Sequence, residues 1–176
     1  MVSAHGQVAP SAFKRNFRLQ AGGLGSVFQP DFFGNGAGTS PQRLYGVGAY
    51  ADARYNRWVS IEAEVRFLRF NEYHPGPNSQ GIYQNTYSIG PLIPFITWHK
   101  FTPYGKALVG WATMADLNGK ALAFTYGGGV DYRLNRKFTI RAFDFEYQQW
   151  RVVNSDNQSD DLWPYGGSVG ISYRIF

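Results

Sequence analysis

Apolar and polar residues alternate with a period of two along most of the chain, which is the pattern of a β-strand with one face in an apolar environment. The alternation is clearest near the end, where every second residue from Val169 to Ile175 is apolar. Each alternating segment is long enough to cross a bilayer at a tilt of about 45°. The pattern predicts eight strands, at 15–28, 43–55, 59–70, 83–96, 103–113, 121–134, 137–150 and 164–176.

Short and long connections alternate without exception between these segments. This alternation is typical of an up-and-down barrel, whose short turns lie at one end and whose long loops lie at the other. We therefore predict an all-β fold, an eight-stranded antiparallel up-and-down transmembrane β-barrel over residues 15–176. The short turns and both termini are expected in the periplasm. Residues 1–14 are predicted to be an N-terminal segment that resembles the tail of a secretory signal. The short connections are 56–58, 97–102 and 135–136, and the long ones are 29–42, 71–82, 114–120 and 151–163.

The charged residues of the strands fall on one face, which is predicted to point into the barrel. The faces of neighbouring strands agree only if the turn has the right number of residues, because a shift of one residue turns every side chain over. Turns at 56–58 and 135–136 meet this condition. An eight-stranded barrel encloses little more than its inward side chains fill, so charges there need partners.

The inward charges are balanced, and we predict that they close the lumen as an ion-pair network. The alternative is a narrow path for protons or ions, or a buried catalytic group. The network is predicted to contain Arg18, Asp52, Arg54, Glu62, Glu64, Arg66, Lys106, Asp131, Arg133, Asp144, Glu146 and Arg174.

Two places depart from the regular alternation. Pro91 and Pro94 cannot donate ladder hydrogen bonds, so a bulge or an early strand end is expected in the fourth strand. Arg141 falls on the lipid side close to a short turn, where its long side chain could reach the head groups.

Composition narrows the class of protein. The chain has no cysteine and therefore no disulfide or thiolate metal site, and the absence of an apolar run of about 18 residues excludes a transmembrane helix. The pI is near 9.5, but the excess basic residues gather at the short-turn end, which favours contact with anionic lipid head groups over nucleic-acid binding. These residues are Lys14, Arg15, Arg57, Lys100, Arg136, Lys137 and Arg141.

Aromatic residues make up 18% of the chain and gather near the predicted strand ends. Two aromatic girdles are the expected pattern at the two interfaces of a membrane barrel. The alternative is the core of a soluble ligand-binding β-barrel. The predicted girdle residues are Tyr45, Tyr55, Trp58, Trp98, Tyr104, Trp111, Tyr132, Trp150 and Trp163.

Three stretches resemble the outer-membrane β-barrel domain family, which includes the small OmpA- and OmpX-like barrels: 103–110, 125–134 and 170–176. The resemblance extends over nearly the whole chain from about Arg15. It implies residence in a bacterial outer membrane, contact with outer-membrane lipids, and recognition of the last strand by the barrel-assembly machinery. Tyr173 and Phe176 are the corresponding assembly signal, although Tyr173 and its neighbours sit one place out of the family register.

Candidate catalytic groups are few. The chain has three histidines, and His74 and His99 are predicted at opposite ends of the barrel, so no metal site and no cofactor are expected. Gly127–Gly129 lacks a following helix and is interpreted as a site of bending or close packing.

The predicted function is that of a structural or interaction barrel. This class includes an accessory subunit of a larger assembly, which would contact other outer-membrane or periplasmic proteins. The alternatives are a narrow pore and a lipid-modifying enzyme with His74 and Ser79 or Ser88.

Overall fold

The structure is a computed structural model that describes residues 17–31, 43–54, 56, 58–70, 83–114, 120–153 and 159–175. The predicted N-terminal segment 1–14 lies outside these ranges. No helix in the described ranges has the length and apolar character needed to cross a membrane. The described strands are β1 (Arg18–Gln29), β2 (Leu44–Arg54), β3 (Ser60–Phe70), β4 (Tyr83–Pro94), β5 (Phe101–Met114), β6 (Ala121–Arg133), β7 (Phe138–Val153), β8 (Ser159–Leu162) and β9 (Tyr165–Arg174).

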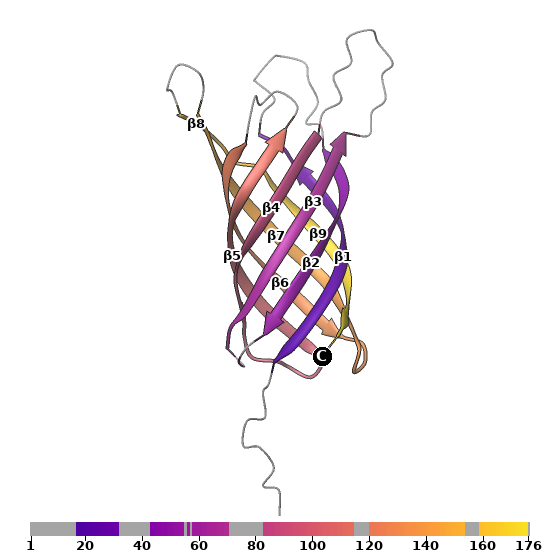
Figure 1. Ribbon diagram of the computed structural model, residues 1–176. Coiled ribbons are helices and arrows are strands. Elements are labelled where there is room, and N and C mark those ends of the chain that lie inside the picture. Colours follow the sequence, from indigo (N-terminus) through magenta and orange to yellow (C-terminus); the bar gives the residue numbers. More distant parts are fainter. Residues whose placement is uncertain are drawn as a thin grey trace, which may run out of the picture.

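Eight of these strands form a closed antiparallel ring. Strands β1 to β7 pair in sequence order, and β9 pairs with both β7 and β1, which closes the barrel. The strands are tilted around a common axis, with the short turns and the marked C-terminal end on one side (Figure 1). The predicted fold, an eight-stranded antiparallel up-and-down barrel, is confirmed. We call the two ends the short-turn end and the long-loop end.

The ring strands begin and end within three residues of the predicted segments. The additional strand, β8, lies inside the predicted connection 151–163 and pairs with the extended end of β7, where Asp161 faces Arg151. It lengthens one hairpin beyond the ring and takes no part in closing the barrel (Figure 1).

The pairing of β4 with β5 is interrupted at Gly90 and Pro91 without a bulge. Pro91 is aligned with Ile61 of β3, but the described pairing with β5 passes from Ile89 directly to Leu92 at an unchanged register. The strand ends at Pro94. The expectation of an early strand end is confirmed, and the missing proline N–H groups explain it.

A β-bulge in β7 overturns the expectation that Arg141 faces lipid. The register between β6 and β7 shifts between Val130 and Asp131, and the register between β7 and β9 shifts in the same part of β7. Ala142 and Phe143 are consequently both exposed, because a bulge opposes two residues to one. Arg141 therefore points inward and is fully buried, with an exposed fraction of 0%.

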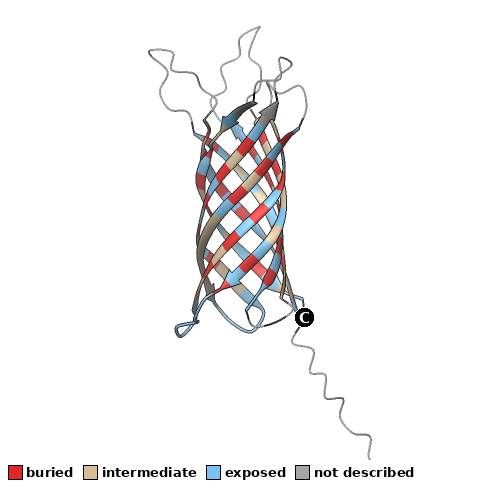
Figure 2. Cartoon of the chain, turned by 90° about the vertical axis from the view of Figure 1, so that its left-hand side faces the viewer, coloured by how far each residue is buried: buried red, intermediate tan, exposed pale blue. Residues whose placement is uncertain are grey.

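The barrel wall has an apolar outer face and an inner face that carries most of the polar and charged side chains of the strands. Buried and exposed residues alternate along each strand (Figure 2), and the exposed positions include large apolar side chains such as Val47, Ile61 and Val169. A wall of this kind satisfies its backbone hydrogen bonds internally and places apolar side chains in contact with lipid.

Two predicted girdle residues, Tyr104 and Trp150, lie inside the barrel, and their assignment to the girdle was wrong. They are 3% and 0% exposed. The physical reason is strand parity: Tyr104 lies two residues before the inward Lys106, and Trp150 lies four residues after the inward Glu146. Tyr55 lies outside the described residues. Tyr132 is half-buried, and Tyr45, Trp58, Trp98, Trp111 and Trp163 are exposed.

Candidate functional site in the barrel lumen

The lumen is filled by three layers of side chains. At the long-loop end lies an apolar layer of buried residues, in the middle an ionic network, and at the short-turn end a group of arginines around a small cavity. Trp150 links the first two layers, since its Nε1 donates to Gln148, whose Nε2 donates to Glu146. The apolar layer consists of Phe28, Leu44, Leu68, Ala112, Ala121, Ala123 and Trp150.

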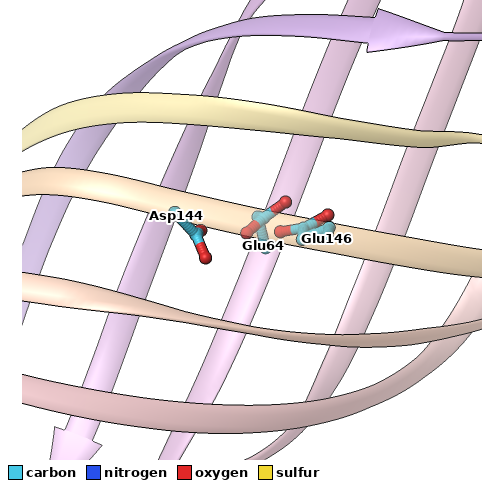
Figure 3. A group of neighbouring side chains, drawn as sticks. All are labelled: Glu64, Asp144 and Glu146. Atoms are coloured by element: carbon cyan, nitrogen blue, oxygen red, sulfur yellow. The ribbon is translucent and has the colours of Figure 1, made fainter.

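Lys106 occupies the centre of the ionic network. Its Nζ lies 3.1 Å from carboxylate oxygens of both Glu62 and Glu64. The same atom lies 2.7 Å from Asp144 and 2.6 Å from Glu146. Three of these carboxylates, from β3 and β7, lie close together inside the barrel in Figure 3. One ammonium with no exposed side-chain surface therefore holds together four buried carboxylates, two from β3 and two from β7.

Arg66 forms the part of the network nearest the apolar layer. Its two terminal nitrogens donate to the two carboxylate oxygens of Glu146, at 2.5 and 2.9 Å, and Nη2 also lies 2.6 Å from Glu64. The guanidinium lies over the ring of Phe28, with 4.6 Å between Cζ and the ring centroid. A two-pronged contact of this kind is the strongest ion-pair geometry available to arginine.

Arg141 completes the network on the other side of Lys106. Its Nη2 lies 2.8 Å from Glu62 and 3.5 Å from Asp52, and its Nε donates to Asp131 over 3.3 Å. Asp144 lies 3.7 Å from Nη1. Sequence reasoning missed this residue because the bulge in β7 gives no simple signal in the period-two pattern.

Two tyrosine rings enclose Arg141. The Cζ atom lies 3.9 Å from the ring centroid of Tyr50 and 4.8 Å from that of Tyr104, distances at which an aromatic face attracts a cation. Gly129 makes room for one of them, since a Cβ at this position would lie 2.7 Å from the Tyr104 hydroxyl. Close packing therefore explains at least this glycine of the Gly127–Gly129 run.

The twelve residues predicted for the network divide into two groups. Eight take part in salt bridges with one another or with Arg141: Asp52, Glu62, Glu64, Arg66, Lys106, Asp131, Asp144 and Glu146. The other four lie at the short-turn end and form no salt bridge with any residue that the structure describes. We call them the mouth arginines: Arg18, Arg54, Arg133 and Arg174.

The charges are unevenly distributed between these groups. In the ionic network three cations face six carboxylates, which leaves an excess of negative charge, and the four mouth arginines provide an excess of positive charge below it. The lumen is therefore nearly neutral as a whole but polarised along the barrel axis.

A metal-site interpretation of the acidic group does not fit the contacts. Oxygens of Glu64, Asp144 and Glu146 lie within 4.8 Å of one another, as ligands of one ion would. However, the Lys106 ammonium contacts all three and already supplies the positive charge that a metal ion would bring.

Of the histidine candidates, only His99 lies within the described residues. His74 and Ser79 lie outside the described residues. His99 lies in the turn between β4 and β5, where it has a positive φ of 56° and its ring packs edge-on against Trp98. Tyr173 of the predicted assembly signal is exposed on the outer face, and Phe176 lies outside the described residues.

Comparisons with known proteins agree with this architecture. Residues 1–174 match the family described as outer membrane protein beta-barrel domain. No curated protein matches the sequence. One similar solved structure is neisserial surface protein A, with 14% sequence identity and a TM-score of 0.58; the match covers 89% of this chain and 96% of that chain. Another is the N-terminal β-barrel domain of OprF from Pseudomonas aeruginosa, with 11% identity and a TM-score of 0.57; the match covers 90% of this chain and 97% of that chain. A third is Ail, the attachment invasion locus protein of Yersinia pestis, with 15% identity and a TM-score of 0.53; the match covers 90% of this chain and 97% of that chain. At these identities the likeness concerns the fold.

Proposed function

Because this chain belongs to the outer membrane protein β-barrel domain family, we propose that it is a structural or interaction barrel of a bacterial outer membrane, with a lumen closed to solutes. One observation carries this proposal: the side chains of Arg66, Lys106 and Arg141 cross the lumen to carboxylates on other strands and are fully buried. A barrel blocked in this way can act through its surfaces. The conductance of the reconstituted protein tests the proposal, and we expect no channels.

Transport and lipid modification receive less support. A pore needs a continuous aqueous path, whereas the apolar layer and the ionic network fill successive levels of the lumen in the described part of the chain. A lipid-modifying enzyme needs a nucleophile and a base at the membrane surface. For the candidate pair, only Ser88 lies within the described residues, where it is half-buried in β4.

We also propose the orientation of the barrel, with the short-turn end and both termini in the periplasm. The supporting observations are the short connections at one end and the general arrangement of bacterial barrels, whose short turns are periplasmic. Basic residues at that end, such as Lys100 and Lys137, lie near aromatic rings and fit contact with anionic head groups.

Cysteine labelling tests this orientation, because the chain contains no cysteine of its own. Ser40→Cys lies in a long connection, and Asn135→Cys lies in the turn between β6 and β7. A maleimide attached to a polymer too large for porins is expected to label Ser40→Cys in intact cells and Asn135→Cys only after the outer membrane is permeabilised. If only Asn135→Cys were labelled in intact cells, the orientation of the barrel would be opposite to the one proposed. The parent protein serves as the unlabelled control.

A further inference from the structure

The mouth arginines surround a cavity at the short-turn end of the lumen. All four lie at strand ends: Arg18 begins β1, and Arg54, Arg133 and Arg174 end β2, β6 and β9. The cavity they line has a volume of about 50 Å³, which exceeds the roughly 15 Å³ that one water molecule needs. Arg18 and Arg133 are exposed, and the other two are half-buried. A small solute can therefore reach the guanidinium groups from the short-turn end.

The strand register forces these like charges together. Arg18 and Arg54 are direct partners across β1 and β2. Gln20 of β1 is aligned with Arg174 of β9, so Arg174 is a diagonal neighbour of Arg18. Like charges that face each other across neighbouring strands destabilise a sheet, and this arrangement therefore has a cost unless a negative charge offsets it.

The nearby carboxylates are already engaged. Asp52 and Asp131 line the same cavity, but both contact Arg141, at 3.5 and 3.3 Å, and Asp52 also accepts a hydrogen bond from Gln20. Among the described residues, no carboxylate lies within 4 Å of a mouth arginine. Arg54 Nε donates a hydrogen bond to the Ser60 hydroxyl over 3.1 Å. Most of the guanidinium donors are thus left for a ligand.

We propose that the mouth arginines form a binding site for a phosphate group. Guanidinium groups present paired N–H donors that match the oxygens of phosphate, and a tetrahedral oxyanion can accept from several arginines at once. Binding offsets the repulsion between neighbouring arginines, in particular Arg18 and Arg54. The phosphate can belong to a soluble ion or to the head group of an anionic phospholipid at the rim of the barrel. This site is independent of whether the lumen conducts.

The test uses the folded protein in a sugar-based detergent, which carries no phosphate. Inorganic phosphate is titrated by calorimetry at constant ionic strength, with chloride as the replaced anion. We expect saturable binding by the parent and affinity at least about tenfold weaker in Arg54→Gln/Arg174→Gln, since each lost charged hydrogen bond contributes about tenfold or more. The matched control, Arg136→Gln/Lys137→Gln, removes two charges from an exposed turn at the same end and is expected to bind within about twofold of the parent.

Two results would overturn the proposal: no saturable binding of phosphate beyond that of chloride, or an equal loss of affinity in both double variants. If Arg54→Gln/Arg174→Gln does not fold, as judged by its mobility on an unheated gel, Arg133→Gln from another part of the wall replaces it. The source of the phosphate is distinguished in bilayer discs. If the affinity for inorganic phosphate falls as the phosphatidylglycerol content of the discs rises, the lipid head group competes for the site and is the ligand. If this affinity is the same in discs of phosphatidylglycerol and of phosphatidylcholine, the ligand is a soluble ion.

Discussion

Lys106→Met is expected to lower the free energy of unfolding by about 3–5 kcal/mol, the range measured when one partner of a buried ion pair is removed. The methionine has a similar length but leaves four carboxylates, Glu62, Glu64, Asp144 and Glu146, facing one another without the ammonium that contacts all of them. Among the cations that the structure describes, only Arg66 and Arg141 then remain to offset the desolvation of these carboxylates. Unfolding in urea, with the protein in lipid vesicles, measures the change.

Two companion variants separate this effect from a general loss of charge. Lys137→Met removes a lysine at the exposed short-turn end and is expected to change stability by no more than about 0.5 kcal/mol. Adding Glu62→Gln to Lys106→Met removes one of the carboxylates that lost the ammonium, while Arg141 keeps its contacts with Asp52 and Asp131, and is expected to restore part of the loss. A change below about 1 kcal/mol for Lys106→Met would contradict the role assigned to the lysine.

Arg141→Leu is expected to destabilise the barrel by a similar amount, about 3–5 kcal/mol. The substitution removes the positive charge shared by Glu62, Asp52 and Asp131. Equilibrium unfolding of parent and variant in the same vesicles gives the difference.

The sign of this result decides on which side of the wall Arg141 lies. An arginine on the lipid face destabilises a barrel by up to about 2–4 kcal/mol at the midplane and by much less near the interface, so its replacement by leucine would leave stability unchanged or raise it. Arg141→Lys keeps the charge but loses the planar fork that reaches several carboxylates, and its stability is expected between those of parent and Arg141→Leu. Stabilisation by leucine would contradict the bulge in β7.

The fold could be predicted from the sequence because two independent signals agree. The period of two sets which residues face lipid, and the alternation of short and long connections sets the antiparallel order. The first signal is clear even in a single segment such as 165–174, where the observed strand β9 follows the predicted one closely.

The lumen could be predicted only in part. Parity places Glu62, Glu64 and Lys106 inside, but a bulge adds one residue to β7 and turns Arg141 inward without changing the composition of the segment. Tyr104 and Trp150 lie near strand ends, which favours the aromatic girdle, but their even spacing from inward residues of the same strands places them inside the barrel. Partners across the lumen depend on the tilt and stagger of the closed ring, which single-strand patterns do not contain.

Electrical recording from planar bilayers tests the central claim, a closed lumen, most directly. Purified protein is inserted at low copy number, a detergent-only addition gives the background, and a large general porin shows that single channels are detectable. We predict that the current stays at background, because buried ion pairs and apolar side chains fill successive levels of the barrel. Repeated stepwise conductance that scales with the amount of this protein would contradict the account.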